Sequence, residues 1–364
     1  MKIRNMLFVG GFLGAAFSYA DDALSEEKII HDDLTFERRG CAEYGSTTLE
    51  NTRGFDGVRA YPNQDRACAV TVKKPVRYDI DDSQISIADL LAGNVPGIME
   101  DPGIFVIGVF DGHGKQGDAI SSLTRFCVCD YFEKFFEHSK TKILYHDFLL
   151  LGQSIQSTLS HNVLAQESGT TGCFCMLEGP LRTKGASHAP YRAVFCNVGD
   201  SRAIVISGNE IVFSTVDHKP TTPSEKDRIV RAGGFVQNGY AWGSNGHGFA
   251  LSRSWGDCTA HTNGVLSSIP EIHSFGVPTQ ASNPLLKIEQ KTSYLVEGDI
   301  IVCATDGLWD VLTNEEVAEY INKRKQEKVT LQVVSEELAL KARSGDNNAV
   351  QASRDDITVI IVQL

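Results

Sequence analysis

The chain has 364 residues, of which 42% are hydrophobic and 22% charged, and this composition excludes disordered, collagen-like and coiled-coil proteins. It allows one large or two ordinary globular domains. Acidic residues outnumber basic ones by 46 to 34, the net charge is −12, and no basic block occurs. We therefore expect no nucleic-acid binding and no docking on anionic membranes, and we favour cations or phosphorylated proteins as partners.

The extreme N-terminus is strongly apolar over residues 6–17, after Lys2 and Arg4 and before an acidic pair. With small residues at Ser18 and Ala20, this layout is typical of a secretory signal peptide. A membrane anchor needs about 20 apolar residues. We expect a signal peptide at residues 1–20, a leader at 21–40 and a secreted protein with no stable membrane insertion after cleavage. An uncleaved anchor and a merely apolar N-terminus are the alternatives.

The nine cysteines do not form a dense disulfide pattern, and their odd number leaves at least one thiol unpaired. No pair has the C-x-x-C spacing of a zinc site. Cys173, Cys175, Cys196 and Cys303 lie in apolar runs. We interpret the cysteines as buried structural thiols.

The next segments alternate between strand and helix patterns. Residues 73–103 interrupt two apolar runs and predict a surface insertion. Residues 104–110 are β-branched and aromatic, and they predict a strand that stops at the turn Asp111-Gly112-His113-Gly114. Helical spacing resumes at Gly117, and a second helix is expected at about 142–166.

The second half of the chain also alternates between strand and helix patterns. Two apolar runs at 193–197 and 203–206, separated by Gly199, Asp200 and Ser201, predict a hairpin. Thr222-Pro223-Ser224-Glu225 predicts a helix whose N-terminus is capped by Thr222 and Glu225. Strands are expected at 300–305 and 357–362, and helices near 314–324 and 331–344.

Four aspartates lie where a strand begins or stops: Asp65, Asp111, Asp306 and Asp355. A single such residue is usually a turn cap, but four together indicate a shared site. Two carboxylates about 4 Å apart repel by about 4 kcal/mol at an effective dielectric constant near 20, so a cation is required. Oxygen donors without Cys or paired His favour Mg²⁺ or Mn²⁺, and two such ions lower the pKa of a shared water.

Nine motifs in order resemble the metal-dependent protein serine/threonine phosphatases of type 2C. The resemblance covers nearly everything from residue 44 to 364, and it rests on Asn63-Gln64-Asp65, Asp111-Gly112-His113-Gly114, Ser168-Gly169-Thr170-Thr171, Gly199-Asp200-Ser201-Arg202-Ala203, Asp217-His218-Lys219-Pro220, Glu225 with Ala232-Gly233-Gly234, Leu251-Ser252-Arg253-Ser254-Trp255-Gly256-Asp257, Asp306-Gly307-Leu308-Trp309-Asp310-Val311 and Ser353-Arg354-Asp355.

The resemblance implies a fold and a set of ligands. The fold is an α/β phosphatase domain at 41–364, with a central β-sandwich of two mainly antiparallel sheets flanked by helices in four layers and a flap at 217–248. It binds two Mn²⁺ or Mg²⁺ ions, with a weaker third ion as an open alternative. The implied metal ligands are Asp111 as the bridge, the Gly112 carbonyl, Asp306 and Asp355 for the first ion, Asp65 for the second and Asp200 for the third.

One position departs from the family, because many members carry Glu where this chain has Gln64. Gln64 is an uncharged candidate ligand, so the second ion is expected to bind more weakly.

The resemblance also implies the remaining catalytic roles. His113 would be the general acid for the departing seryl oxygen. Arg59 would hold the substrate phosphate, with Arg53 as the alternative, because an Arg matches two phosphate oxygens. Asp217 and His218 are expected to be structural, and Leu308, Trp255 and Trp309 to pack in the core.

The function implied is that of a protein serine/threonine phosphatase acting on phosphorylated proteins, in which metal-bound hydroxide attacks phosphorus directly. No Cys-x5-Arg motif supports a cysteine nucleophile. Two alternatives stay open: a secreted, inactive or weakly active phosphatase-like binding protein, and a hydrolase of small phosphate esters. We expect a monomer.

Overall fold

The computed structural model describes residues 44–49, 63–72, 103–138, 145–179, 190–243, 246–276, 290–291, 294–344 and 355–364. The expected signal peptide and leader, nearly all of the expected insertion at 73–103, and both candidate phosphate ligands, Arg53 and Arg59, lie outside these residues.

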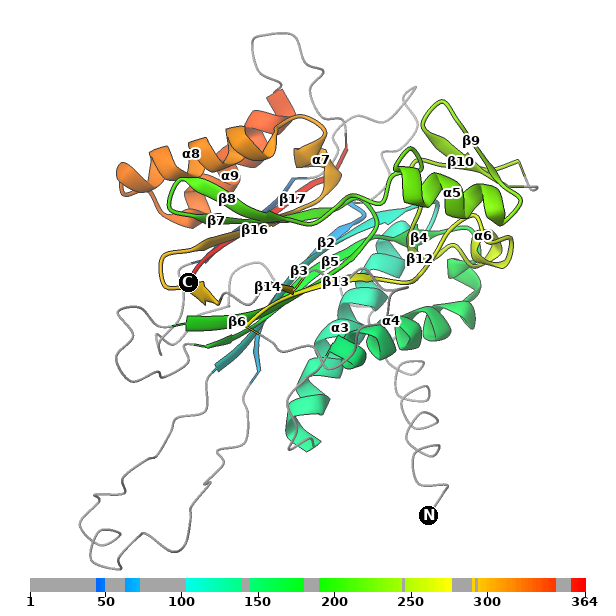
Figure 1. Cartoon of the computed structure of the whole chain (residues 1–364), viewed down its shortest axis with the longest axis horizontal. Helices are drawn as coiled ribbons and strands as arrows, with labels where there is room; N and C mark the ends of the chain where they lie inside the picture. Colours follow the sequence, from blue (N-terminus) through cyan, green and yellow to red (C-terminus); the bar gives the residue numbers. More distant parts are fainter. Residues whose placement is uncertain are drawn as a thin grey trace, which may run out of the picture.

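The centre of the molecule is two sheets packed face to face (Figure 1). One sheet is antiparallel throughout, and its order is β1 (Tyr44–Leu49), β17 (Ile357–Gln363), β16 (Ile300–Ala304), β7 (Arg202–Ser207) and β8 (Glu210–Ser214). The main strands of the other are β2 (Asp65–Val72), β3 (Gly103–His113), β5 (Gly172–Gly179), β6 (Pro190–Val198) and β13 (Glu271–Phe275). Its short strands are β4 (Gly169–Thr170), β12 (Trp255–Gly256), β14 (Gln290–Lys291) and β15 (Leu295–Val296).

Helices cover the two outer faces of the sandwich (Figure 1). The larger sheet is covered by α3 (Gly117–His138), α4 (Tyr145–Ser160) and the short η2 (Val163–Ala165). The smaller sheet is covered by α7 (Asp306–Trp309), α8 (Asn314–Gln326) and α9 (Leu331–Ser344). The expected four-layer α/β architecture is therefore confirmed, and so are the two helices expected near 314–324 and 331–344.

The alternation of side chains along each strand separates the core into layers. In β5, Cys173 and Cys175 point into the space between the sheets, whereas Phe174 and Met176 point toward the helices. Cys303 of β16 also lies in the inner layer. These thiols are buried as expected, and Trp255, Leu308 and Trp309 are core residues as expected.

The flap is a small unit beside one end of the sandwich (Figure 1). It contains α5 (Pro223–Arg231) and an antiparallel sheet of β9 (Phe235–Gln237), β10 (Tyr240–Trp242) and β11 (Gly248–Phe249), with α6 (Cys258–Thr262) next to it. Ile229, Ala241 and Val265 form its apolar centre.

Two expectations about strands were wrong. The runs at 193–197 and 203–206 do not pair as a hairpin: β6 pairs with β5, β13 and β15, whereas β7 pairs with β8 and β16, so the chain crosses between the sheets. The strand from 104 does not stop at residue 110 either, because β3 continues through His113, where Gly112 and His113 pair with β4.

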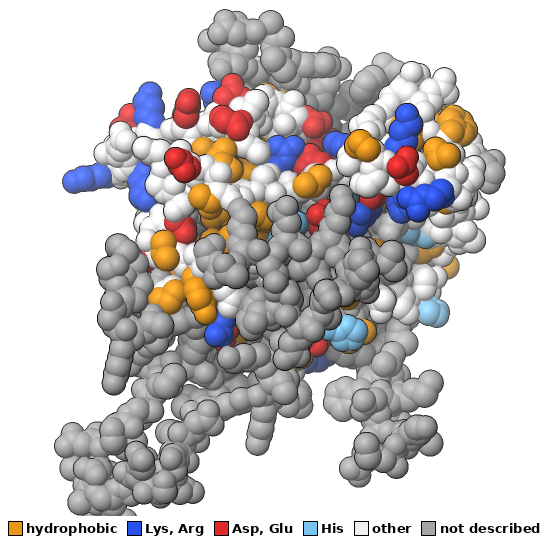
Figure 2. All heavy atoms as spheres, viewed as in Figure 1, with side chains coloured by type: hydrophobic (Ala, Val, Ile, Leu, Met, Phe, Trp, Pro, Cys, Tyr) orange, Lys and Arg blue, Asp and Glu red, His pale blue; other side chains and the backbone are white. Residues whose placement is uncertain are grey.

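Acidic and basic side chains are interspersed over α5 and α8 on the face shown in Figure 2. Within the described ranges, no helix is both long and apolar enough to cross a membrane.

Candidate metal centre and active site

The topology brings the candidate carboxylates to one end of the sandwich. Asp65 opens β2 and lies opposite Asp111 of β3 in an antiparallel register. Asp306 follows β16 and Asp355 precedes β17, and these strands are also antiparallel neighbours. Since one antiparallel strand begins where its neighbour ends, the four residues converge. Asp200, in the crossing between β6 and β7, reaches the same end.

Asp65 is the most deeply buried of these aspartates. It is 2% exposed, and Thr305 Oγ1 donates a hydrogen bond to its Oδ2 at 2.9 Å. Its Oδ1 is also buried and has no hydrogen-bond partner. Burial and the charge of Asp356 raise the pKa of Asp65 to about 7. This carboxylate is therefore held in place with one oxygen unsatisfied.

The other carboxylates of the cluster repel one another. Burial, followed by the charges of Asp65 and Asp306, raises the pKa of Asp111 well above its usual value. The pKa of Asp306 is raised well above its usual value by burial and then by Asp200 and Asp355. Asp355 is an exposed residue, and partial desolvation together with the charge of Asp356 raises its pKa. Desolvation and like charges both oppose ionisation, so a cation would stabilise the charged forms.

The donor set fits a hard divalent cation. It consists of carboxylate oxygens with a backbone carbonyl and an amide side chain nearby, and this chemistry suits Mg²⁺ or Mn²⁺. Among the described residues, no three His, Cys, Asp or Glu side chains are already grouped closely enough to hold an ion. The unsatisfied Oδ1 of Asp65 is an oxygen donor available to an ion.

Two glycines allow the backbone to approach closely at this end. A Cβ on Gly112 would lie 2.2 Å from the Gly117 carbonyl oxygen and 2.8 Å from the Gln64 carbonyl oxygen. A Cβ on Gly117 would lie 2.6 Å from the Gly112 carbonyl carbon. The helix α3 can therefore start directly against the end of β3, the strand end that carries Asp111.

Gln64 holds this region together by hydrogen bonds. Its Nε2 donates to the Gly114 carbonyl at 2.8 Å, and its backbone N donates to Asp356 Oδ2 at 2.8 Å. Its carbonyl accepts from Ser121 Oγ at 2.6 Å. The residue expected as an uncharged metal ligand thus also anchors the loop that follows His113.

Lys219 is a residue whose place in the site was not predicted. Its Nζ donates to Asp200 Oδ2 at 2.5 Å and lies 3.9 Å from Asp306 Oδ2. Burial lowers the pKa of Lys219, but Asp200 and Asp306 outweigh it and raise the pKa above the usual value. The Asp217-His218-Lys219-Pro220 motif could have indicated this position, because Lys219 was the one charged residue of the motif to which no role was assigned.

His113 lies beside the cluster and is held by Asp257, whose place in the site was also missed. His113 Nε2 and Asp257 Oδ2 are 2.7 Å apart, and Ser254 Oγ donates to the same oxygen at 2.6 Å. Asp257 is 1% exposed. Burial lowers the pKa of His113, but the charge and hydrogen bond of Asp257 outweigh it and raise the pKa.

Gly169 makes room for this pair of side chains. A Cβ at Gly169 would lie 2.2 Å from Asp257 Oδ2 and 2.7 Å from His113 Nε2. Asp257 itself has a left-handed backbone with φ of 42°. The Ser168-Gly169 and Gly256-Asp257 motifs, distant in sequence, therefore meet around the His113 ring.

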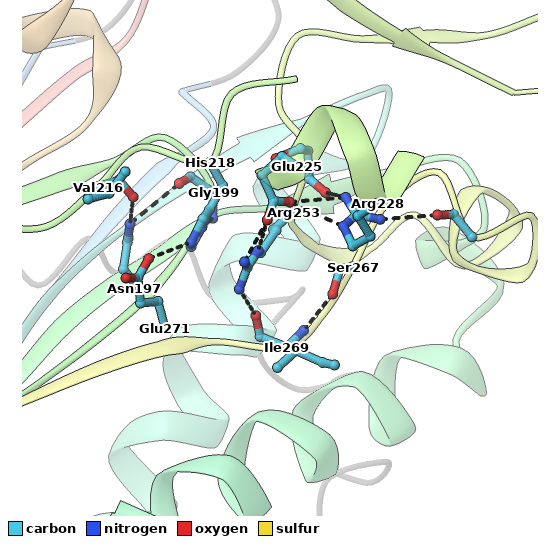
Figure 3. Close-up of polar contacts among 12 residues, drawn as sticks. Asn197, Gly199, Val216, His218, Glu225, Arg228, Arg253, Ser267, Ile269 and Glu271 are labelled. Carbon is cyan, nitrogen blue, oxygen red and sulfur yellow. Dashed lines mark hydrogen bonds and ion pairs between the residues drawn. The ribbon is translucent and has the colours of Figure 1, made fainter. Parts of the chain in front are cut away.

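Asp217 and His218 are structural, as expected. Asp217 accepts two hydrogen bonds from Arg202, at 2.8 and 2.6 Å. His218 Nδ1 accepts from the Gly199 backbone N at 3.1 Å, and its Nε2 contacts Glu271 Oε2 at 3.2 Å. These bonds fix the start of the flap to the sandwich, and Figure 3 shows His218 beside Gly199 and Glu271.

Glu225 is the centre of a second polar network (Figure 3). Its Oε1 accepts from Arg253 at 2.6 and 3.1 Å, and its Oε2 accepts from Arg228 at 3.1 and 3.2 Å. Arg253 also donates to the Ile269 carbonyl at 2.8 Å. The expected helix is present, with Thr222 at its N-cap position and Pro223 at its start as expected, but the Thr222 side chain makes no cap hydrogen bond and Glu225 binds arginines instead.

Comparison with known proteins identifies the family. The family model named Protein phosphatase 2C matches residues 82–348, which is most of the chain. The chain belongs to the protein phosphatase 2C family. The matched range includes Asp111, Asp200 and Asp306, whereas Asp65 and Asp355 lie outside it.

Curated relatives agree with this family. Protein phosphatase 1B of Homo sapiens is 28% identical over 308 residues, which cover 79% of this chain and 54% of the relative. Protein phosphatase 1A of Homo sapiens is 30% identical over 178 residues, which cover 49% of this chain and 42% of the relative. The chain thus spans about half the length of the curated relatives it matches.

Solved structures support the fold. The serine-threonine phosphatase 2C from Toxoplasma gondii has a TM-score of 0.54 at 21% identity, covering 89% of this chain and 95% of that chain. A phosphatase from a pathogenic strain of Toxoplasma gondii has a TM-score of 0.59 at 17% identity, covering 89% and 93%.

Proposed function

We propose that this chain is a protein serine/threonine phosphatase that depends on Mn²⁺ or Mg²⁺ and acts on phosphorylated proteins. The observation that carries the proposal is the cluster of aspartates at one end of the sandwich, which are buried or repel one another, beside a histidine held by its own carboxylate. Perturbed carboxylates of this kind are typical of functional sites. Family membership supports the same reaction.

The proposed ligands are Asp65, Asp111, the Gly112 carbonyl, Asp306 and Asp355, with Asp200 for a weaker third ion and Gln64 as an uncharged neighbour. When bound, the two ions neutralise the carboxylates, act as Lewis acids toward phosphate and activate water. The protein's part is to fix the oxygen donors at the strand ends.

His113 is the proposed general acid. With Nε2 engaged by Asp257, the ring is oriented and Nδ1 is the nitrogen that gives its proton to the leaving seryl or threonyl oxygen. The raised pKa of His113 keeps more of the ring protonated near neutral pH. The proposed phosphate ligand is Arg59, with Arg53 as the alternative.

A comparison of two substrates distinguishes the candidate functions. Turnover of a phosphoserine peptide and of a small phosphomonoester is measured under Mn²⁺, with and without chelator. A phosphoprotein phosphatase hydrolyses the peptide only when metal is present. Turnover of the small ester alone would indicate a small-ester hydrolase, and no turnover of either would indicate a binding protein.

We propose that the chain is secreted as a monomer after removal of residues 1–20. The apolar run at 6–17 with Ser18 and Ala20 supports this. N-terminal sequencing of protein expressed in a eukaryotic secretory system should begin at Asp21, and light scattering should give the mass of one chain. Recovery from cytosol with Met1 still present would contradict the proposal.

A further inference from the structure

A pair of thiols lies between β2 and α3, outside the catalytic end. Cys68 of β2 is 6% exposed and belongs to the core between the larger sheet and its helices. Cys129 of α3 is half-buried and packs against the same cluster. Each of these two thiols shifts the pKa of the other, so they are electrostatic neighbours.

The side-chain directions on β2 place Cys68 against the helix. Ala67 and Ala69 pack into the layer between the two sheets, whereas Cys68 and Val70 pack on the helix side. Because alternate residues of a strand share a face, Arg66 points the same way as Cys68, and its Nε donates to Ser122 Oγ of α3 at 2.7 Å.

The periodicity of α3 places Cys129 on the corresponding face. Cys129 follows Ser122 by two helical turns, so both side chains face β2. Ser122 contacts Arg66, and Cys129 reaches the next residue on that face of the strand, Cys68. Strand and helix therefore hold two cysteines, far apart in sequence, on facing surfaces around one apolar cluster.

The two sulfurs differ in reactivity. The side chain of Cys68 lowers the pKa of Cys129, and Arg125 lowers it further, whereas burial acts in the opposite direction. Cys129 and burial raise the pKa of Cys68. Since the thiolate is the nucleophile, Cys129 is the half-buried, reactive member, and Cys68 is the buried partner behind it.

We propose that Cys68 and Cys129 are a redox-active pair that closes to a disulfide between β2 and α3 when a peroxide reacts with Cys129. The Cys129 thiolate attacks one oxygen of hydrogen peroxide, which breaks the O–O bond, gives a sulfenic acid and releases hydroxide, protonated to water. The Cys68 sulfur, losing its proton, attacks the Cys129 sulfur and displaces the hydroxyl group as a second water. Two thiols and one peroxide thus give one disulfide and two waters.

The chain provides matched controls for this pair. Cys127 lies on the same helix two residues earlier, and burial raises its pKa to about 12. Cys258 of α6 is half-buried like Cys129, but burial and then Asp257 raise its pKa. Similar burial alone would make Cys258 as reactive as Cys129, whereas the lowered pKa of Cys129 and the raised pKa of Cys258 should make Cys129 the faster to react, by about tenfold.

The test is peroxide oxidation of the full chain, followed by alkylation of free thiols, digestion without reductant and mass spectrometry. We expect linked peptides containing Cys68 and Cys129, with Cys127 and Cys258 alkylated. Formation should raise the melting temperature by on the order of 5 °C, and dithiothreitol should reverse the rise. In Cys68→Ser, a 1,3-dicarbonyl reagent should trap Cys129 sulfenic acid; Cys127→Ser should form the bridge as the wild type does.

Three results would overturn the proposal. One is oxidation of Cys258 at the same rate as Cys129. Another is conversion of Cys129 to sulfinic acid in the wild type while Cys68 stays free. The third is a melting temperature that peroxide leaves unchanged in the wild type. None of these readouts uses phosphatase activity, so the proposal stands or fails independently of the proposed function.

Discussion

Two buried carboxylates, one in the flap and one at the end of the sandwich, have pKa values shifted in opposite directions. In the flap, burial raises the pKa of Glu225, but Arg253 and Arg228 outweigh it and lower the value to about 2. At the end of the sandwich, burial and Asp356 raise the pKa of Asp65 to about 7. Glu225 has a cationic partner for each oxygen, whereas Asp65 has an oxygen with no hydrogen-bond partner.

This difference indicates two roles. A carboxylate paired with arginines stabilises the fold, whereas the aspartates at the end of the sandwich are available to bind a cation. A paired buried carboxylate contributes to stability as long as its partners remain. A cluster whose charges are only partly compensated, here by Lys219, lowers the stability of the protein without ions, and that cost is offset when a divalent cation binds the native state. Neutralising a carboxylate should therefore have opposite effects on stability in the two places.

The largest expected effect is at Asp306. Asp306→Asn removes a proposed ligand of the first ion, whose Lewis acidity contributes several kcal/mol to catalysis, so phosphopeptide turnover should fall by about a thousandfold or more. The melting temperature of the chelated variant should equal or exceed that of the chelated wild type, because one repelling charge is gone. Turnover near the wild-type rate would contradict the assignment.

The second effect concerns the leaving group. His113→Gln should reduce turnover of a phosphoserine peptide by about 10²–10⁴-fold, because serine alkoxide needs a proton to depart. Nitrophenyl phosphate should be affected far less, since nitrophenolate leaves without a proton. Asp257→Asn should show a smaller difference between the two substrates in the same direction, because it weakens the hydrogen bond that orients the His113 ring. Equal losses for both substrates at saturating Mn²⁺ would remove His113 from this role.

The third effect is on the paired carboxylate of the flap. Glu225→Gln leaves Arg228 and Arg253 without their anion, and since both arginines are partly exposed we expect a loss of about 2 kcal/mol, less than for a fully buried pair. In the wild type, the ion pairs of Glu225 contribute stability above about pH 4.5, and this contribution is lost as the pH falls toward 2. Thermal unfolding checks this, and Glu327→Gln, in the exposed pair with Arg324, is the control expected to change little. Equal losses in both variants would contradict the comparison.

The smallest effect is at Gln64. Gln64→Glu adds charge at a partly solvated position, so the Mn²⁺ concentration for half-maximal activity should fall several-fold, equivalent to about 1 kcal/mol. The variant also loses the hydrogen bond from Gln64 to the Gly114 carbonyl. Gln64→Ala loses the same bond without adding charge and is the matched control. An unchanged metal titration in Gln64→Glu would show that this position does not tune the ion.

Local patterns predicted elements better than they predicted pairing. Strands β3, β6, β7, β16 and β17 and helices α8 and α9 were expected near their observed bounds, whereas β1, β2, β5, β8 and β13 were not predicted. The runs at 193–197 and 203–206 satisfied every local requirement of a hairpin, yet they lie in different sheets. Their pairing is decided by β5 and β16, which are remote in the sequence, so no local pattern could reveal it.

The sequence likewise predicted only part of the candidate site. Aspartates at strand ends were visible as a pattern, because turn chemistry and chain position both marked them. Asp257 was not assigned, since an Asp after Gly256 also fits a turn, and only the fold brings it to His113. Glu225 fitted a helix cap by spacing, but its arginine partners come from packing.

The most direct test of the central claim, that Lys219 alone leaves the acidic end incompletely compensated until a divalent cation binds, is the melting temperature at pH 5 and pH 8, with chelator and with Mn²⁺. The pKa of Asp65 is about 7 when folded and about 4 when unfolded. Its stability contribution is therefore full below pH 4 and lost as pH rises through 7. The chelated protein should melt several degrees lower at pH 8 than at pH 5, and Mn²⁺ should raise the value most at pH 8. A melting temperature independent of both pH and Mn²⁺ would contradict the account.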